Sequence, residues 1–263
     1  ALLFPTGYQA NLAVCSTVCE SGELICSDQL NHASIIDGVR LSKAKRHIAP
    51  HADGRSVPPN ARLVIVEGVY SMDGDVPDLT QYPSGPWLMV DEAHAVGVLG
   101  PDGRGSAANQ DVHADILVGT FGKAYGAAGA FVVGPPELKE LLINEGRSFI
   151  YTTGMPAPVA AMCLAGLRAA DDELRQRLAS NVKYFRDALQ DQGHSPLGHH
   201  HIVPIVIGPG VVARAAQMLE LGVYAPAIRW PTVTLGKERI RFTVSAAHSH
   251  LQLDRIVDAL GRA

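Results

Sequence analysis

An acidic residue and a histidine stand directly after one of the apolar runs of this sequence. Leu88–Val90 is short and carries no polar alternation, and Asp91 and His94 follow it. Such a run is typical of a strand that is buried on both faces, and in an open α/β sheet ligands bind beyond the carboxyl ends of the strands. Alone, the segment also fits an interpretation in which Asp91 only caps a helix and His94 lies in a loop.

A lysine follows a second apolar run in the same way. Ile116–Gly119 leads into Thr120 and then into Lys123, which stands between Gly122 and Ala124. Small residues beside a lysine at the end of a strand can keep its amine desolvated, which favours the neutral, nucleophilic form that makes an imine. Alone, a lysine after a strand is more often a solvated loop residue, and Thr120 a residue of a local turn.

Lys123 and Asp91 together predict a site for pyridoxal 5'-phosphate (PLP). This cofactor requires a lysine amine for its Schiff base and a carboxylate beside its ring nitrogen. We expect Lys123 to form the Schiff base and Asp91 to keep the ring nitrogen protonated, so that the ring can accept electrons from a substrate. The segment Thr6–Asn11 predicts a phosphate site, because a glycine turn that opens a helix presents free N–H groups to an anion.

The elements that must position these side chains alternate along the first half of the chain. Six apolar runs predict strands at Leu2–Phe4, Leu24–Cys26, Leu63–Val66, Leu88–Val90, Ile116–Gly119 and Ala130–Val133. Helical patterns lie near Gln9–Val18, Ala33–Ser42 and Pro136–Asn144. This alternation predicts a mostly parallel, doubly wound α/β sheet. Prolines crowd the links before Leu63 and before Leu88, so we expect loops there in place of crossover helices.

The pattern changes after Pro156, which predicts a second domain. A long helical stretch is expected at Pro158–Gln192. Three short apolar strands are expected at Ile202–Ile207, Val223–Ala225 and Arg239–Val244. Two more helices are expected at Val212–Leu221 and Leu251–Leu260. We therefore expect a large cofactor-binding α/β domain over residues 1–159 and a smaller C-terminal α+β domain over residues 160–263.

Composition argues against several classes of partner. The net charge is -4 and there is no long run of Lys or Arg, which disfavours binding to nucleic acid or to a membrane surface. No apolar stretch approaches the roughly 20 residues that span a bilayer, and no signal peptide is visible, which predicts a cytoplasmic protein. The cysteines show no CxxC pair, and the adjacent side chains of His199–His201 point in different directions, so no metal site is expected.

Several motifs resemble those of the α-oxoamine synthases, a family of PLP enzymes, in both order and spacing. They are Thr6–Asn11, Asn31–Gly38, Glu67–Gly74, Asp91–His94, Thr120–Lys123 and the glycines at 97, 103 and 105. The resemblance covers nearly the whole chain and implies a fold type I PLP transferase. Relative to that family we expect the N-terminal segment to be absent. Gly154 replaces a usual serine, Trp230 replaces a usual proline, and Ala95 and Val96 alter the stretch after His94.

The resemblance also implies a role for each cofactor-binding residue. His32 stacks on the ring, although it also fits a helix-start histidine that is satisfied by the backbone. Ser71 and His94 bind the ring hydroxyl oxygen. The backbone N–H groups of Gly7 and Tyr8 and the hydroxyl of Thr120 bind the phosphate. The residues implied to be catalytic are Lys123, His32, Asp91 and His94.

The remaining implied roles concern the substrate and a second subunit. Glu67 and Thr232 lie near the substrate together with His32, and Arg241 pairs with the substrate carboxylate. On sequence alone Arg241 is equally well an exposed strand residue. Thr152 and Thr153 resemble a pair that reaches the phosphate of the neighbouring subunit, which implies a homodimer with shared sites.

Within the family, the C-terminal motifs are most similar to those of the biotin-pathway member. These motifs are Ala227–Val233, Arg239–Arg241 and Ser245–His248. The similarity implies a decarboxylative Claisen-type condensation of L-alanine with pimeloyl-CoA, or with a carrier-protein equivalent, that releases CoA and CO2. Two alternatives stay open. One is a family member that uses glycine or serine with a different acyl-CoA, and the other is a truncated, non-catalytic relative that acts as a subunit partner.

Overall fold

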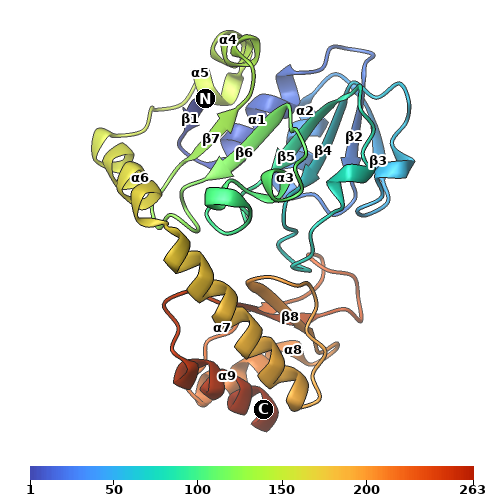
Figure 1. Ribbon diagram of the computed structural model, residues 1–263. Coiled ribbons are helices and arrows are strands. Elements are labelled where there is room, and N and C mark those ends of the chain that lie inside the picture. The colour runs from blue at the N-terminus through green and yellow to red at the C-terminus, as the bar shows by residue number, and fades with distance from the viewer. The chain divides into compact units, whose positions relative to one another are not determined.

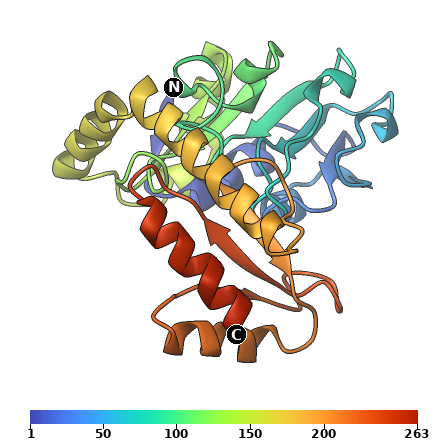
Figure 2. The same ribbon diagram turned by 60° about the horizontal axis from the view of Figure 1, so that its bottom comes forward.

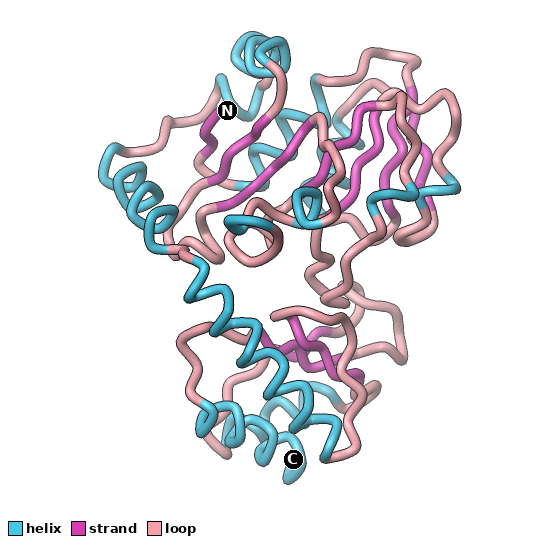
Figure 3. Tube along the Cα trace, in the orientation of Figure 1, coloured by secondary structure: helices cyan, strands magenta, loops and turns pink.

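The computed structural model describes residues 1–263, which form two compact units (Figures 1 and 3). The first unit comprises Ala1–Tyr70 and Val76–Asp171, and the second comprises Ser71–Asp75 and Asp172–Ala263. The division into a large and a small domain after residue 159 stays a prediction. No helix is both long and apolar enough to cross a membrane, and the cytoplasmic location also stays a prediction.

The first unit is built on a seven-stranded sheet with the strand order β1-β7-β6-β5-β4-β2-β3. The strands are β1 (Leu2–Phe4), β2 (Leu24–Asp28), β3 (Lys45–Ala49), β4 (Leu63–Glu67), β5 (Trp87–Asp91), β6 (Ile116–Thr120) and β7 (Ala130–Val133). Strands β2 to β6 pair in parallel, whereas β7 is antiparallel to β6 and β1 is antiparallel to β7. The prediction of a mostly parallel α/β sheet is therefore confirmed.

The helices of this unit lie between the strands. They are α1 (Gly7–Thr17), α2 (Ala33–Leu41), α3 (Ser106–Asn109), α4 (Pro136–Glu145), α5 (Arg147–Ile150) and α6 (Ala157–Ala169). The two proline-rich links contain only short 3-10 turns, η1 (Gly54–Ser56) and η2 (Leu79–Gln81), and a third turn, η3 (Pro101–Gly103), precedes α3. The prediction that these two links lack crossover helices is confirmed.

Both faces of the sheet are buried, which explains why its strands are apolar without alternation. On β4, Leu63 and Ile65 join the core that contains α1 and α2, whereas Val64 and Val66 join a second core on the opposite face. Successive side chains of a strand point to opposite faces, so each central strand must be apolar at every position. Figure 1 shows α1 and α2 together on one side of this sheet.

The second unit has a three-stranded antiparallel sheet and three helices. Its strands are β8 (Ile202–Val206), β9 (Ala227–Ile228) and β10 (Arg239–Thr243), in the order β8-β10-β9. Its helices are α7 (Asp172–Asp191), α8 (Val211–Glu220) and α9 (His250–Arg262). Figure 2 shows α7 in orange and α9 in red. They are joined by Tyr184, whose ring stacks on His250 at 3.9 Å and whose hydroxyl donates to Asp254 at 2.7 Å.

Three sequence predictions about elements were wrong. The strand β3 was missed because most of its residues are exposed at the edge of the sheet, so it carries no apolar run. The expected strand Val223–Ala225 is not a strand, because its buried side chains fill the core from a loop. The single long helix expected from Pro158 is two helices, since Ala170 leaves the helical conformation at ψ 77° before α7 begins.

We expect Gly38→Ala to destabilise the first unit by about 1–3 kcal/mol through overpacking. A Cβ at Gly38 would lie 2.7 Å from the Cβ of Cys15 on α1, so the two helices must move apart. This cost exceeds the roughly 1 kcal/mol that alanine gains over glycine inside a helix. Urea unfolding measures the change. Gly154→Ala is the control because a Cβ there meets nothing within 4 Å, and an unaltered midpoint for Gly38→Ala would contradict the prediction.

Candidate active site

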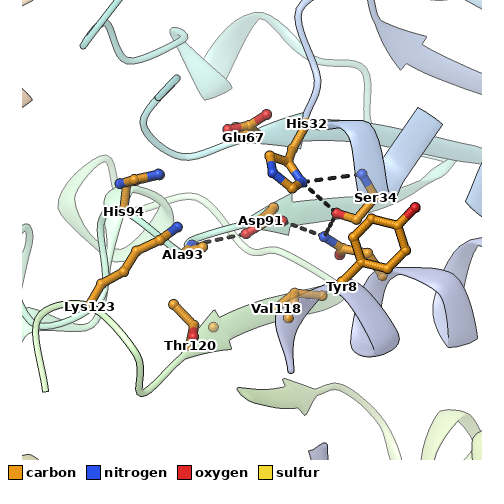
Figure 4. A pocket seen from close by; sticks show the side chains of 13 residues that line it. Tyr8, His32, Ser34, Glu67, Asp91, Ala93, His94, Val118, Thr120 and Lys123 are labelled. Carbon is orange, nitrogen blue, oxygen red and sulfur yellow. Dashed lines mark hydrogen bonds between the residues drawn. The ribbon is translucent and has the colours of Figure 1, made fainter. Parts of the chain in front are cut away.

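A pocket opens where β4, β5 and β6 end and where α1 and α2 begin (Figure 4). Its lining residues are Gly7, Tyr8, Asn11, His32, Ser34, Glu67, Asp91, Ala93, His94, Val118, Gly119, Thr120 and Lys123. Eight residues singled out in the sequence lie in this pocket, namely Gly7, Tyr8, His32, Glu67, Asp91, His94, Thr120 and Lys123. The parallel pairing of β4, β5 and β6 brings their ends to one edge of the sheet, as expected for a ligand site.

The amino end of α1 provides an anion-binding wall of the pocket. Thr6 caps the helix, and its hydroxyl oxygen accepts from the N–H of Gln9 at 3.2 Å. A Cβ at Gly7 would meet nothing within 4 Å, so the backbone there faces open space that a phosphate can approach. The hydroxyl of Tyr8 donates to the carboxylate of Asp37, and this hydrogen bond raises the pKa of Tyr8.

Asp91 is held as an acceptor at the end of β5. Its Oδ1 accepts from the N–H of Ala93 at 2.9 Å, and its Oδ2 accepts from Nδ2 of Asn11 at 2.7 Å. Only 6% of the residue is exposed. Each carboxylate oxygen can accept more than one hydrogen bond, so Asp91 retains the capacity to accept from a ring N–H. The free acceptor capacity of Asp91 therefore fits a pyridine ring that is protonated at nitrogen.

The neighbouring carboxylate, Glu92, has a structural role that no sequence pattern predicted. It is fully buried and accepts from the N–H groups of Ser106 and Ala107, both at 2.8 Å, and from the Ser106 hydroxyl at 3.0 Å. Burial raises the pKa of Glu92. These bonds fix the amino end of α3 to the end of β5, and so they anchor the loop that carries His94.

Glu67 pairs with Asp91 across the adjacent strands β4 and β5. Burial, together with the charge of Asp91, raises the pKa of Glu67 well above its usual range. A hydrogen bond from the backbone of His32 and the charge of Lys123 oppose that rise. Two carboxyl groups on adjacent strands of a buried site cannot both ionise cheaply, so this arrangement favours the protonated form of Glu67.

Lys123 enters the pocket from the turn after β6. Figure 4 shows its side chain reaching toward Ala93 and Asp91, with His94 beside it. Thr120, at the end of β6, donates its hydroxyl hydrogen to the carbonyl of Gly129 at 2.9 Å and accepts from the N–H of Gly122 at 3.1 Å. The turn role that the sequence left open for Thr120 is therefore real, and in this arrangement its oxygen offers only an acceptor to the pocket.

His32 both lines the pocket and caps α2. Its Nδ1 lies 2.7 Å from the Ser34 hydroxyl and accepts from the Ser34 N–H at 3.2 Å. The preceding Asn31 donates to the hydroxyl of Ser27 at 2.9 Å and to the carbonyl of Ile65 at 2.8 Å, which ties the start of α2 to the sheet. The helix-capping role and the pocket position are thus combined in one residue.

Five residues of the pocket were not predicted from the sequence, and the two with polar side chains are Asn11 and Ser34. Asn11 is 2% exposed and Ser34 is 1% exposed, and Nδ2 of Asn11 donates to the Ser34 hydroxyl at 2.9 Å. A usable signal was present, because Asn11 is four residues after Gly7 and so shares its helix face. Asparagine is a poor helix former, and its place on a buried face indicates a polar partner.

The other residues singled out in the sequence lie outside this pocket. Ser71, Thr232 and Arg241 belong to the second unit, where Nη1 of Arg241 donates to the carbonyl of Ser71 at 3.0 Å and its Nε is buried without a partner. Burial lowers the pKa of Arg241. Thr232 is exposed.

Thr152 and Thr153, the pair expected to reach the phosphate of a neighbouring subunit, lie in the loop after α5. The hydroxyl of Thr152 accepts from Nε2 of Gln9 at 2.8 Å, and Thr153 is exposed. His199–His201 lies in the second unit, and no group of three or more His, Cys, Asp or Glu side chains is arranged to hold a metal ion. All four cysteines are buried thiols.

Comparisons with known proteins agree with this geometry. The family model described as aminotransferase class I and II matches residues 1–260. An 8-amino-7-oxononanoate synthase from Alcanivorax borkumensis is 42% identical over 281 residues, an alignment that covers 100% of this chain and 73% of the relative.

Solved structures agree as well. One is an 8-amino-7-oxononanoate synthase from Francisella tularensis, at a TM-score of 0.88 and 28% identity, with 99% of this chain and 81% of that chain covered. Another is an SPT, a serine palmitoyltransferase, solved with its PLP internal aldimine. It aligns at a TM-score of 0.92 and 30% identity, with 99% of this chain and 71% of that chain covered.

We expect Glu67→Gln to remove a pH dependence from the stability of the cofactor-free protein. Folded wild type keeps the Glu67 proton, whereas the unfolded chain releases it above about pH 4.3. Wild-type stability therefore falls with rising pH by up to about 1.4 kcal/mol per pH unit, until the pH passes the raised pKa of Glu67. Urea unfolding between about pH 5 and pH 8 should show the variant gaining on wild type.

The surface variant Glu20→Gln controls for the loss of one carboxylate. Curves for Glu67→Gln and wild type that run parallel across this pH range would show that Glu67 is ionised in the folded protein.

Proposed function

The chain belongs to the aminotransferase class I and II family, and within it to the α-oxoamine synthases, and we propose from that premise that it joins L-alanine to a pimeloyl thioester. It is a PLP-dependent acyltransferase. The proposed products are 8-amino-7-oxononanoate, CoA and CO2, in biotin biosynthesis. The observation that carries the proposal is the buried Asp91 carboxylate, held by two donors in the same pocket as Lys123.

Lys123 and Asp91 supply the central chemistry. Bound PLP supplies an electron sink for the negative charge that develops at the substrate Cα. The Lys123 amine would hold the cofactor, and the same amine would take the proton from the substrate Cα as general base. Asp91 holds a proton at the ring nitrogen. Since one amine serves in turn as anchor, base and acid, the pocket needs no second base near the Cα.

The other pocket residues bind and orient. The N–H groups of Gly7 and Tyr8 bind the phosphate at the start of α1, with Thr120 beside them. His32 covers one face of the ring, and His94 binds the ring hydroxyl oxygen. This assignment is supported by the open backbone at Gly7 and by the loop that Glu92 anchors around His94.

Four further roles complete the proposal. Arg241 pairs with the substrate carboxylate, a task for which its buried, unpartnered Nε is suited. Ser71 binds the ring hydroxyl oxygen together with His94. Glu67 and Thr232 border the substrate.

The choice of L-alanine and a pimeloyl thioester is supported by the 42% identity to relatives that are named 8-amino-7-oxononanoate synthase.

We expect the purified chain to bind PLP covalently at Lys123. Reduction with borohydride, followed by digestion and mass spectrometry, should place the reduced cofactor on the peptide that contains Lys123. Lys123→Ala should lose this adduct and should lower turnover by about 10²–10⁴-fold, the range for loss of a general base. Lys139→Ala, on the exposed surface of α4, is the matched control. An unmodified Lys123 peptide would contradict the proposal.

The preference among substrates is measured as the rate of CoA release with each pair of amino acid and acyl-CoA. L-alanine with pimeloyl-CoA should give a higher kcat/KM than glycine or serine with pimeloyl-CoA, and a higher value than serine with palmitoyl-CoA. The product mass identifies 8-amino-7-oxononanoate. A preference for serine with palmitoyl-CoA would assign the chain to another α-oxoamine synthase, and PLP binding without any turnover would favour the non-catalytic alternative.

We propose a homodimer in which Thr152 and Thr153 bind the phosphate of the partner's site, and mixed dimers test it. Neither Lys123→Ala nor the double variant Thr152→Ala with Thr153→Ala should be fully active alone. If sites are shared, a hybrid dimer holds one site with every defect and one intact site. Random mixing should therefore restore about a quarter of wild-type sites. Activity no greater than the mean of the two parents would show that each site is built from one chain.

A further inference from the structure

A continuous chain of hydrogen bonds joins Asp91 on β5 to His32 at the start of α2, through α1. Nδ2 of Asn11 donates to Oδ2 of Asp91 at 2.7 Å and to the hydroxyl oxygen of Ser34 at 2.9 Å. The Ser34 hydroxyl in turn lies 2.7 Å from Nδ1 of His32. Figure 4 shows the dashed bonds that start from His32, Ser34 and Asp91. Asn11, Ser34 and Asp91 are all at most 6% exposed, so water does not compete for their bonds.

The hydrogen bonds from Asp91 to His32 all run in one direction, because each donor and acceptor along them has a fixed role. Both oxygens of Asp91 accept hydrogen bonds, so the Asn11 side chain must turn its NH2 group toward them. The opposite orientation would bring the amide oxygen of Asn11 against a carboxylate oxygen. The Asn11 oxygen is instead buried without a partner, a cost that the two bonds from Nδ2 offset.

The orientation of the Asn11 amide also determines which atoms of Ser34 and His32 donate and which accept. The backbone N–H of Ser34 donates to Nδ1 of His32 at 3.2 Å, which marks Nδ1 as an acceptor, so the Ser34 hydroxyl, whose oxygen accepts from Asn11, turns its single hydrogen to the same nitrogen. A ring nitrogen that accepts from two donors carries no hydrogen of its own. The imidazole hydrogen must therefore be on the other ring nitrogen, Nε2, which is directed away from Ser34.

We propose that Asn11 and Ser34 are positioning residues that fix His32 as the neutral Nε2–H tautomer and orient Asp91 through the same chain of bonds. His32 then presents the pocket with a hydrogen-bond donor and never with a basic nitrogen. Proton abstraction is left to Lys123, although the two side chains line one pocket. This consequence for catalysis rests on the proposed function, whereas the tautomer itself does not.

The tautomer is tested directly by NMR on protein labelled with 15N-histidine, with and without PLP. The signal of His32, one of 11 histidines, is assigned by its loss in His32→Gln. We expect wild type to show a protonated Nε2 and an unprotonated Nδ1. Ser34→Ala should give a mixture of tautomers, and Ser34→Thr, which keeps the hydroxyl, should restore the wild-type pattern. Ser42→Ala, at the end of the same helix, is the control because its hydroxyl bonds the carbonyl of Val39.

Asn11→Ala separates a positioning role from local packing. Asn11 forms no bond to His32 itself, yet its loss frees the Ser34 hydroxyl to turn, so the tautomer mixture should appear at His32. An unchanged His32 signal in folded Asn11→Ala overturns the role of Asn11. If that variant does not fold, Ser34→Ala and Ser34→Thr decide the question. A wild-type proton on Nδ1, or an unchanged His32 signal in Ser34→Ala, overturns the proposal as a whole.

Turnover gives a second, independent measurement. A half-populated wrong tautomer lowers the competent fraction about twofold, so kcat of Ser34→Ala should fall by at least that factor while the KM for the acyl donor stays unchanged. Absence of turnover in wild type would count against the proposed function alone, because the NMR result requires no substrate.

Discussion

The arrangement of the pocket depends on how one buried carboxylate, Asp91, is satisfied at the end of β5. An unpaired buried charge is costly, and here two donors offset that cost, the N–H of Ala93 from the same loop and Nδ2 of Asn11 from α1. The bond to Asn11 fixes α1 relative to the sheet. Because α1 also presents its amino end to the pocket, the group that we propose for the ring nitrogen and the group that we propose for the phosphate belong to one rigid arrangement.

Three carboxyl groups lie at this sheet edge, and each is accommodated by a different physical means. Asp91 is matched with two donors, and Glu92 is matched with the two N–H groups and the hydroxyl at the start of α3. Glu67 receives one backbone N–H, that of His32, and burial beside Asp91 raises its pKa well above the usual range. Asp91 is therefore the carboxyl group of this edge that is left available for the proposed ring nitrogen, and the other two groups contribute shape and support.

The double role of His32 follows from the way α2 begins. A helix leaves its first N–H groups without partners, and here the imidazole Nδ1 satisfies one of them. The capping bond favours Nδ1 as an acceptor, and in our proposal the Ser34 hydroxyl is the second donor that is needed to fix it in that state. Helix capping and the protonation pattern of the pocket are thus set by the same local interaction, which links the stability of α2 to the chemistry of the site.

The parallel α/β sheet, the strand ends that carry Asp91 and Lys123, and the family could all be predicted from the sequence. These features are local, since an apolar run and the residues that follow it are written contiguously in the chain. The packing of the folded chain was needed to show that Asn11 and Ser34 join Asp91 to His32 and that Glu92 holds α3. It also decided that β3 is an edge strand and that a loop, not a strand, fills the core at Val223. Those outcomes depend on contacts between elements that are far apart in sequence. Each buried polar group needs a hydrogen-bond partner, and a local sequence pattern does not identify that partner.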